Sequence, residues 1–421
     1  MHDPMTFKKT KKRVLTRRGV MWLGQTCNQR CYFCYFVNRI TDCDDPMHDF
    51  MDLDKAKQIC KTLREYYGNT AIDIQGGEPT IYADIFELIR YCREIGLYPT
   101  LITNGLALGR PGVLEKYRDA GIRDFLVSLH GIGGVHDEVV GVNGAYEKIV
   151  RAIERMREVG IPFRLNCTMS KPVVPVIPEI ARKAIEYGAY AVNYIAFNPF
   201  GDQEQGRRTR ENVARYSDIK PHLTEAMDTL EAADIEANAR YLPLCMAEPR
   251  HRKNFYNYQQ LSYDTHEWDY ASWLWTMMAP QMMKDGNVMP AFPIGLGARK
   301  IYQCDGIVLR DRYEQGHLKT RMKFAAQRVA GRLDQWVRGK EVLCRGEARS
   351  RAARECQYIQ NEVCQRCALR NICDGFHGDY AEIFGMKEAS AITNMGLIDS
   401  PTFFIREQEK VVEQEDESWA L

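Results

Sequence analysis

The sequence predicts an α/β protein in which a parallel sheet curls into an incomplete barrel. Between residues 19 and 200, short apolar runs alternate with amphipathic stretches of helical spacing. Strand and helix units that follow one another in series form parallel sheets with right-handed crossovers. One cysteine-rich loop follows the first apolar run, and a second group of cysteines lies near the C-terminus. We therefore expect a partial (βα)6 TIM-like barrel that carries a Cys-rich C-terminal extension.

The expected strands are the apolar runs of this region. They are Val20–Leu23, Ala71–Gln75, Thr100–Thr103, Phe125–Leu129, Phe163–Thr168 and Ala191–Phe197. Helical spacing of apolar residues predicts helices over residues 53–67, 81–94, 113–120, 146–156, 177–187 and 219–230. Gly68 and Gly160 stand where glycine commonly ends a helix, and Asn143 stands where an N-cap is expected. In such barrels the active-site residues lie at the carboxyl ends of the strands.

Composition divides the chain into five segments. Residues 1–18 form a basic arm, 19–200 the barrel, 201–300 an aromatic-rich linker that covers the substrate, 301–400 a Cys-rich domain and 401–421 a charged tail. The arm is expected to be solvated or to form a first helix, and the tail to fray. The aromatic side chains between Tyr241 and Met283 either pack in the core or form a wall of the substrate site.

Charge, hydropathy and cysteine content exclude several function classes. The net charge of +1 argues against a nucleic-acid partner. No apolar run approaches the roughly 18 residues of a membrane span, and no apolar segment follows the basic N-terminus as in a secretory signal. Fourteen cysteines without an export signal indicate reduced thiols and metal binding in a reducing compartment, most simply the cytoplasm.

The first cysteine group is the loop Cys27-x3-Cys31-x2-Cys34, which directly follows the first expected strand. A loop of this spacing can place three thiolates around one corner of a cubic iron–sulfur cluster. Such clusters usually take four cysteine ligands, so three leave one iron open for a ligand that is not protein. A zinc site and three buried thiols are the alternatives, although zinc sites more often show paired C-x2-C hooks.

With the aromatic Phe33 before its last cysteine, this loop resembles that of the radical S-adenosylmethionine (SAM) enzymes. The resemblance implies that Cys27, Cys31 and Cys34 hold a catalytic [4Fe–4S] cluster whose open iron binds SAM. It also implies that a flavodoxin- or ferredoxin-type donor reduces the cluster. One-electron reduction then splits SAM to a 5′-deoxyadenosyl radical, which takes a hydrogen atom from the substrate.

Polar residues at the ends of later strands fit the same family. The segment Gly76-Gly77-Glu78-Pro79 follows the second strand and resembles the family's GGEP segment, whose backbone and Glu contact the amino group of SAM. Paired glycines also let a backbone approach a ligand closely and leave its N–H and C=O groups free. By resemblance, Ser128 and Asn166, with Asn104, contact the ribose or carboxylate of SAM, or they satisfy neighbouring backbone. His130 stands where related sequences often carry Asp.

The second cysteine group resembles the C-terminal SPASM extension, or its shorter twitch form, which holds auxiliary [4Fe–4S] clusters. Its C-x2-C-x5-C core is Cys364, Cys367 and Cys373, and Cys356 precedes it. A full SPASM domain has further cysteines, and His377 occupies the first of those places, so one auxiliary cluster on these four cysteines is the expectation. Cys245, Cys304 and Cys344 remain substitutes as ligands, and a zinc site is the alternative.

The predicted function is that of a radical SAM enzyme acting on a small polar metabolite, such as a sugar, aminoglycoside or nucleoside. The auxiliary cluster would assist oxidation or rearrangement. Enzymes with SPASM-like extensions often modify ribosomally made peptides through an N-terminal leader-binding domain, and about 26 residues before Cys27 are too few for one. A peptide maturase is the first alternative. A non-catalytic iron–sulfur carrier or zinc-stabilised protein is the alternative of another class.

Overall fold

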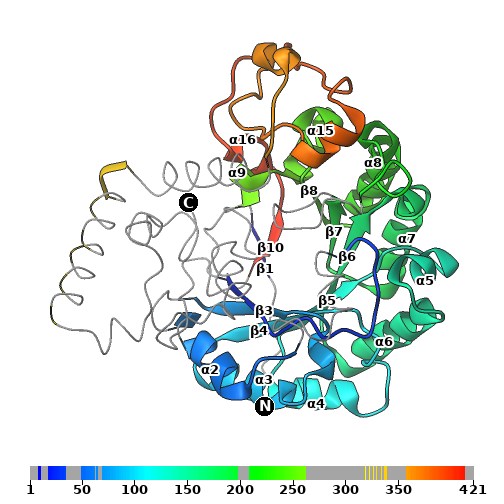
Figure 1. Cartoon of the computed structure of the whole chain (residues 1–421), viewed down its shortest axis with the longest axis vertical. Coiled ribbons are helices and arrows are strands. Elements are labelled where there is room, and N and C mark those ends of the chain that lie inside the picture. Colours follow the sequence, from blue (N-terminus) through cyan, green and yellow to red (C-terminus); the bar gives the residue numbers. More distant parts are fainter. Residues whose placement is uncertain are drawn as a thin grey trace.

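The computed structural model describes residues 8–10, 18–34, 49–61, 63–64, 69–197, 208–261 and 357–412. It also describes the isolated helical residues 318, 322, 326, 329, 333 and 336–338. A curled sheet with helices on its outer face forms the bulk of the described residues, and a C-terminal segment caps one end (Figure 1).

The central sheet has eight strands, and each pairs in parallel with the next along the chain. They are β2 (Arg18–Trp22), β3 (Ala71–Gln75), β4 (Tyr98–Thr103), β5 (Asp124–Ser128), β6 (Phe163–Met169), β7 (Ala191–Ala196), β8 (Glu236–Arg240) and β9 (Phe255–Tyr256). The six expected strands and the parallel α/β architecture are confirmed. β8 and β9 were not predicted, so the sheet extends into the segment assigned to an aromatic-rich linker.

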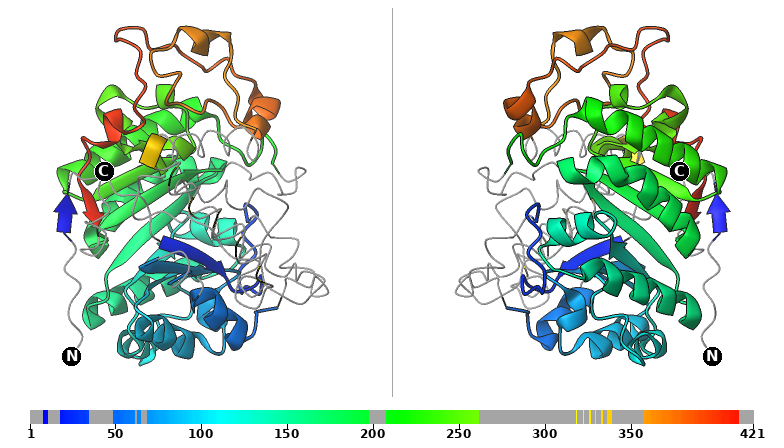
Figure 2. Two further views of the ribbon diagram at one scale, coloured as in Figure 1. Left: turned by 90° about the vertical axis from the view of Figure 1, so that its left-hand side faces the viewer. Right: turned by 90° about the vertical axis from the view of Figure 1, so that its right-hand side faces the viewer.

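Helices cover the outer face of this sheet (Figure 2). They are α2 (Leu53–Lys61), α3 (Ile85–Glu94), α4 (Val113–Ala120), α5 (Gly134–Val140), α6 (Ala145–Val159), α7 (Ile177–Tyr187) and α8 (Tyr216–Ala232). Gly160 ends α6 with φ 76°, as expected, but the N-cap of α6 is Gly144 rather than Asn143. Gly68 lies outside the described residues. In the part of the chain that the structure describes, we find no α-helix with the length and hydropathy of a transmembrane span.

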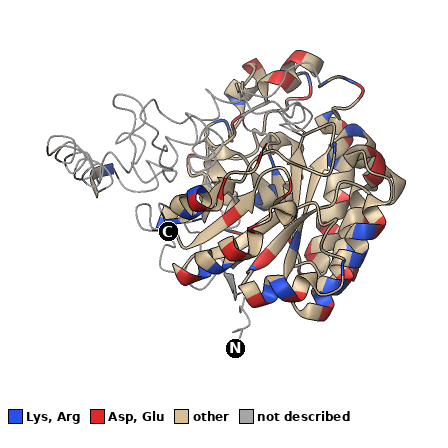
Figure 3. Ribbon diagram, turned by 60° about the horizontal axis from the view of Figure 1, so that its bottom comes forward, with Lys and Arg blue, Asp and Glu red and all other residues tan. Residues whose placement is uncertain are grey.

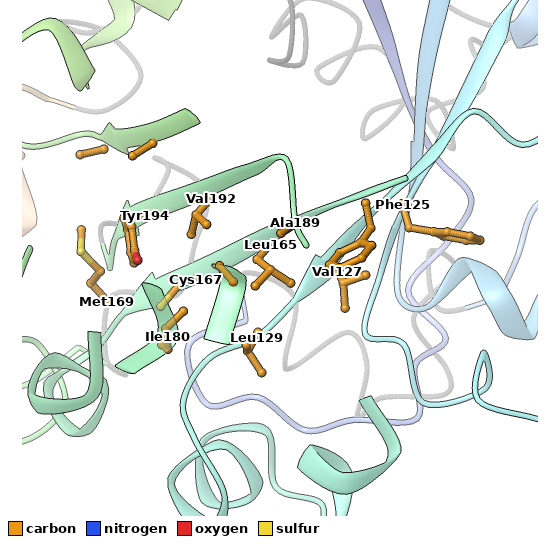
Figure 4. Packing of buried hydrophobic residues seen from close by; sticks show 14 of the residues in the cluster. Phe125, Val127, Leu129, Leu165, Cys167, Met169, Ile180, Ala189, Val192 and Tyr194 are labelled. Atoms are coloured by element: carbon orange, nitrogen blue, oxygen red, sulfur yellow. The ribbon is translucent and has the colours of Figure 1, made fainter. Parts of the chain in front are cut away.

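The core lies between the sheet and these helices, because side chains along each strand alternate between two faces. On β6 the side chains of Leu165, Cys167 and Met169 are fully buried beneath the helices. Figure 4 shows them beside Phe125, Val127, Leu129, Ile180, Ala189, Val192 and Tyr194. The intervening residues on β6, Asn166 and Thr168, point to the barrel interior, where they line a cavity.

A buried ionic cluster fills the barrel interior near the amino ends of the strands. The Asp124 carboxylate accepts hydrogen bonds from Arg164 Nε at 2.9 Å, Arg123 Nε at 3.2 Å and Tyr190 Oη at 2.6 Å. Thr100 also donates to it. The Asp124 and Arg164 side chains are fully buried. Buried charges of this kind persist only when they are paired and hydrogen-bonded.

The C-terminal segment packs on the β8 side of the barrel (Figures 1 and 2). It contains the 3-10 helix η7 (Glu362–Arg366), α15 (Gly378–Phe384) and α16 (Thr402–Ile405). The Tyr380 ring stacks on Tyr216 of α8 with centroids 3.7 Å apart. In addition, Asp374 Oδ2 accepts a hydrogen bond of 2.7 Å from the Tyr258 N–H of α9 (Tyr258–Leu261).

The N-terminal arm and the C-terminal tail are not arranged as the sequence predicted. The strand β1 (Lys8–Thr10) pairs antiparallel with β10 (Lys410–Val412), so the basic segment and the start of the tail form a two-stranded ribbon. Charges on the surface are mixed, and Lys and Arg alternate with Asp and Glu along the outer helices (Figure 3).

Candidate functional site

A cavity of about 180 Å³ lies at the carboxyl ends of the central strands. Nearly all the residues predicted for the first cluster and for SAM line it: Cys27, Cys31, Phe33, Cys34, Gly76, Gly77, Glu78, Asn104, Ser128 and Asn166. The exception is Pro79, a buried residue that begins the 3-10 helix η2 (Pro79–Ile81). The parallel sheet brings these residues together because every β-strand ends at the same rim.

The cysteine loop is held by its own backbone. Cys34 N donates to Cys31 O at 3.0 Å, and Arg30 N donates to Val140 O at 3.0 Å. Gln29 N donates to the Cys27 sulfur at 3.4 Å. Burial, aided by the Glu78 carboxylate, raises the pKa of Cys27 to about 12, and burial also raises the pKa of Cys31. The thiols therefore need a positive centre to hold them as thiolates, and a metal centre supplies one.

The three thiols are not arranged as ligands of one ion. In the part of the chain that the structure describes, no three His, Cys, Asp or Glu side chains are placed to hold a single metal ion. A zinc–sulfur bond of about 2.3 Å would bring tetrahedral thiolates to about 3.8 Å from one another. A polynuclear cluster spreads its cysteines further apart, because each binds a different iron.

The two glycines of the GGEP segment pack against the start of the cysteine loop. A Cβ at Gly77 would lie 1.9 Å from Thr26 O, and Gly76, at φ 155°, would place one 2.7 Å from Gly24 O. Gly77 N donates to Gly24 O at 2.8 Å, and Glu78 N donates to Thr26 O at 2.9 Å. The expectation that the backbone N–H groups of the paired glycines stay free for a ligand is therefore wrong for Gly77. Their role is to fix the cysteine loop against β3.

The Glu78 carboxylate joins the ends of β3 and β4. Its Oε1 accepts from Thr80 N at 3.0 Å, Thr80 Oγ1 at 2.6 Å and Thr103 Oγ1 at 2.7 Å. Its Oε2 accepts from Asn104 N at 2.6 Å. The residue is 1% exposed, and this burial raises its pKa. Because both oxygens bond to the protein, Glu78 acts on this site mainly by holding the strand ends together.

Asn104 extends this link to the cysteine loop. Its Nδ2 donates to Asn28 Oδ1 at 2.6 Å and lies 4.0 Å from the Cys27 sulfur. Its Oδ1 accepts from Leu106 N at 3.1 Å. The side chain predicted to contact SAM is thus engaged with the loop that carries the cysteines.

Three buried polar atoms that line the cavity make no hydrogen bond within the described ranges. They are Gln29 Nε2, Gln75 Nε2 and Asn166 Oδ1. Asn166 lies opposite Ser128 in the β5–β6 register. Unpaired buried polar atoms are costly, so they indicate a polar ligand in the native site. Two donors and one acceptor beside three thiols fit an iron–sulfur cluster with a zwitterionic nucleoside such as SAM. Gln29 is an x position of the cysteine loop and Gln75 precedes the GGEP segment, so neither motif predicted a ligand contact for these side chains.

His130 closes one wall of the cavity as a neutral ring. Its Nδ1 accepts a 3.0 Å hydrogen bond from Thr168 N, so the proton resides on Nε2. Burial holds its pKa well below the usual range. The ring packs edge-to-face on Phe33, with centroids 4.6 Å apart. His130 therefore presents an N–H donor and an apolar surface to the cavity.

The second cysteine group is described in part. Cys364, Cys367 and Cys373 lie in the C-terminal segment, whereas Cys356, Cys304 and Cys344 lie outside the described residues. His377 is the N-cap of α15, and its Nδ1 accepts from Asp379 N at 3.2 Å. The thiols of Cys60, Cys92 and Cys167 are buried.

Comparison with known proteins places the barrel in a family. Residues 23–185 match the Radical SAM superfamily. The chain is 32% identical over 191 residues to the AdoMet-dependent heme synthase of Oleidesulfovibrio alaskensis, covering 45% of this chain and 47% of that protein. It is 27% identical over 222 residues to the probable GTP 3′,8-cyclase of Sulfurisphaera tokodaii, covering 52% and 67%. It is 31% identical over 137 residues to the PqqA peptide cyclase of Bradyrhizobium diazoefficiens, covering 32% and 36%.

The chain spans about half the length of the first of these relatives. The matched residues contain the cysteine loop, the GGEP segment and the strand ends that line the cavity. Members of the family are enzymes that use a [4Fe–4S] cluster and SAM. Residues 23–185 of this chain are therefore a radical SAM domain.

Proposed function

We propose that the cavity binds a [4Fe–4S] cluster on Cys27, Cys31 and Cys34, with SAM beside it, and that the substrate lies over the same rim. The observation that carries this proposal is the meeting of three thiols and three unpaired polar atoms in one cavity. When bound there, the cluster and SAM supply a 5′-deoxyadenosyl radical that removes a hydrogen atom from the substrate. A flavodoxin- or ferredoxin-type protein supplies the electron.

The chain's own residues bind and orient these groups. Gln29 Nε2 and Gln75 Nε2 are donors suited to a carboxylate, and Asn166 Oδ1 is an acceptor suited to an amino or hydroxyl group. Ser128, across from Asn166, offers a hydroxyl to the same ligand. Phe33 and the ring of His130 pack together as an apolar part of the cavity wall and exclude water there. Such exclusion protects a reactive intermediate from side reactions.

The C-terminal segment is proposed to hold one auxiliary [4Fe–4S] cluster, within a domain spanning about residues 301–400. Cys364, Cys367 and Cys373 supply three of its thiolates. Four protein thiolates would close the cluster and suit it to accept or donate one electron during substrate oxidation. We propose that this domain covers the substrate.

The substrate that we propose is a small metabolite of nucleoside or nucleotide type. The sequence favours a small polar molecule, and one relative is named for GTP and another for heme. No relative described above is named for a sugar or an aminoglycoside, so these two classes lose support. A peptide is the second candidate, which the similarity to the PqqA peptide cyclase favours.

Reconstitution tests the proposal. The anaerobically reconstituted protein, given SAM and dithionite, should release 5′-deoxyadenosine. The C27A/C31A/C34A variant should release none while keeping the iron of the second cluster. A wild-type protein that binds iron but forms no 5′-deoxyadenosine would refute the enzymatic proposal. Nucleotides and short peptides are then compared for their ability to stimulate 5′-deoxyadenosine formation, and the class that accelerates it identifies the substrate.

A further inference from the structure

Four cysteine thiols from two distant parts of the chain meet at the end of the barrel. Cys245 lies in the 3-10 helix η5 (Leu244–Met246), which follows β8. The backbone N–H of Leu244, the residue before Cys245, donates to the Cys373 sulfur at 3.4 Å. Burial raises the pKa of Cys245 and of Cys373. The neighbouring thiols add to this rise, Cys364 and Cys367 for Cys245 and Cys245 for Cys373.

Backbone N–H groups donate hydrogen bonds to the sulfurs of this group. Cys367 accepts from Leu369 N at 3.4 Å and from Ile392 N at 3.5 Å. The backbone of Ser390 bonds to Cys245. Cysteines that ligate iron–sulfur clusters carry negative charge, and hydrogen bonds to their sulfurs stabilise that charge and tune the potential.

The isolated cysteines of the barrel lack this arrangement. Cys60 and Cys92 lie sulfur to sulfur at 3.5 Å in the core. Burial is the sole cause of the raised pKa of Cys167, with no backbone hydrogen bond to its sulfur. N–H contacts from other residues therefore distinguish the thiols of Cys245, Cys367 and Cys373 from the buried thiol of Cys167.

The two segments that carry the four cysteines are joined by buried hydrogen bonds. Asp374 N donates to Asn257 Oδ1 at 2.8 Å, and Gln259 Nε2 donates to Asp374 Oδ1 at 3.0 Å. Gln260 Nε2 donates to Ile372 O at 2.9 Å. These contacts fix the Cys373 turn against the chain that follows Cys245, so the approach of Cys245 is built into the fold.

We infer that Cys245 is the fourth ligand of the auxiliary cluster, together with Cys364, Cys367 and Cys373 and in place of Cys356. The inference rests on the second cluster of the proposed function. One ligand then comes from the barrel and three come from the C-terminal segment. The iron–sulfur bonds of the cluster therefore also link the barrel to the C-terminal segment.

The test measures iron in the full-length protein after removal of the first site. The C27A/C31A/C34A background should hold about four iron atoms and an equal amount of sulfide per chain. Adding Cys245→Ala should lower that content and abolish the EPR signal of the reduced [4Fe–4S] cluster. Adding Cys356→Ala should leave both unchanged, and Cys167→Ala is the matched control for loss of a buried thiol.

Other outcomes distinguish a wrong fourth ligand from the absence of the second cluster. Loss of the signal with Cys356→Ala and its retention with Cys245→Ala would overturn the inference. A background variant with no iron, or with zinc instead, would overturn the second cluster as well, while leaving the 5′-deoxyadenosine test of the first site unaffected. Cys245→Ser keeps the size of the side chain, so far-UV circular dichroism should match the background while the EPR signal shifts or disappears. An unchanged signal would also contradict the assignment.

Discussion

Glu78→Gln replaces one oxygen of a fully engaged carboxylate with an amide nitrogen. The Gln carbonyl can keep the three hydrogen bonds that Oε1 accepts from Thr80 and Thr103. The amide nitrogen would then face Asn104 N, which lies 2.6 Å from Oε2 in the wild type. Two donors at that distance cannot bond, so the Asn104 N–H is left unsatisfied in a buried site.

An unsatisfied buried donor costs about 1–3 kcal/mol, and we expect Glu78→Gln to destabilise the fold by about that amount. Glu78→Ala leaves the backbone N–H groups of Thr80 and Asn104 both unpaired, and should cost about 2–6 kcal/mol by the same reasoning. Removing the buried charge offsets part of either loss. Burial raises the Glu78 pKa above its ordinary 4.5, so the folded wild type binds its proton more readily than the unfolded chain. Wild-type stability therefore falls as pH rises above about 4.5, and that part of the pH dependence is absent in Glu78→Gln.

Denaturant unfolding of the wild type and both variants measures the free energies. Glu94→Gln, at an exposed position on α3, is the matched control and should not change stability. Because Asn104 lies 4.0 Å from the Cys27 sulfur, we also expect Glu78→Gln to slow 5′-deoxyadenosine formation about tenfold or more. A Glu78→Gln protein as stable and as active as the wild type would refute the view that this carboxylate aligns the site.

Three further changes test other contacts. Gly77→Ala would place a Cβ 1.9 Å from Thr26 O and should abolish iron binding at the first site, whereas Gly134→Ala, with open space around it, should retain all iron. Asp124→Ala leaves two buried arginines without their shared carboxylate. We expect the free energy of unfolding, measured with denaturant, to fall by about 3–5 kcal/mol. A decrease below about 1 kcal/mol would contradict the pairing. His130→Asn keeps an acceptor for the backbone N–H of Thr168 but loses the Nε2 donor. It should unfold like the wild type yet bind SAM or substrate roughly two- to tenfold more weakly, as one hydrogen bond predicts; equal affinity in titration calorimetry would show that the donor is unused.

The strands β8 and β9 are the part of the sheet that local sequence patterns did not predict. Six strands were predictable because each is a short apolar run beside a helix. β8 reads Glu-Ala-Asn-Ala-Arg, and its polar side chains are buried inside the barrel. Asn238 Nδ2 donates to Asn193 Oδ1 at 3.0 Å, and Gln408 Nε2 donates to Ala237 O at 2.7 Å. These partners are distant in sequence, so no local pattern could reveal the strand.

The candidate site was predictable wherever a local motif carries the chemistry. The cysteine spacing and the GGEP segment led to the residues that line the cavity, although the glycines serve to pack the loop and Glu78 to join strand ends. Gln75 and the Nε2–H tautomer of His130 depend on how neighbouring strands meet. The approach of Cys245 to Cys373 depends on the docking of the C-terminal segment. Only a three-dimensional structure supplies such relations.

The ionic cluster around Asp124 closes the barrel interior near the amino ends of the strands. The Asp124 carboxylate and its arginine and tyrosine partners lie in the interior on the amino side of the cavity and block access from that end. A ligand of the cavity must therefore approach from the carboxyl ends of the strands or from the open side of the incomplete barrel. A bulky ligand bound on that side would hold a smaller, deeper ligand in the cavity.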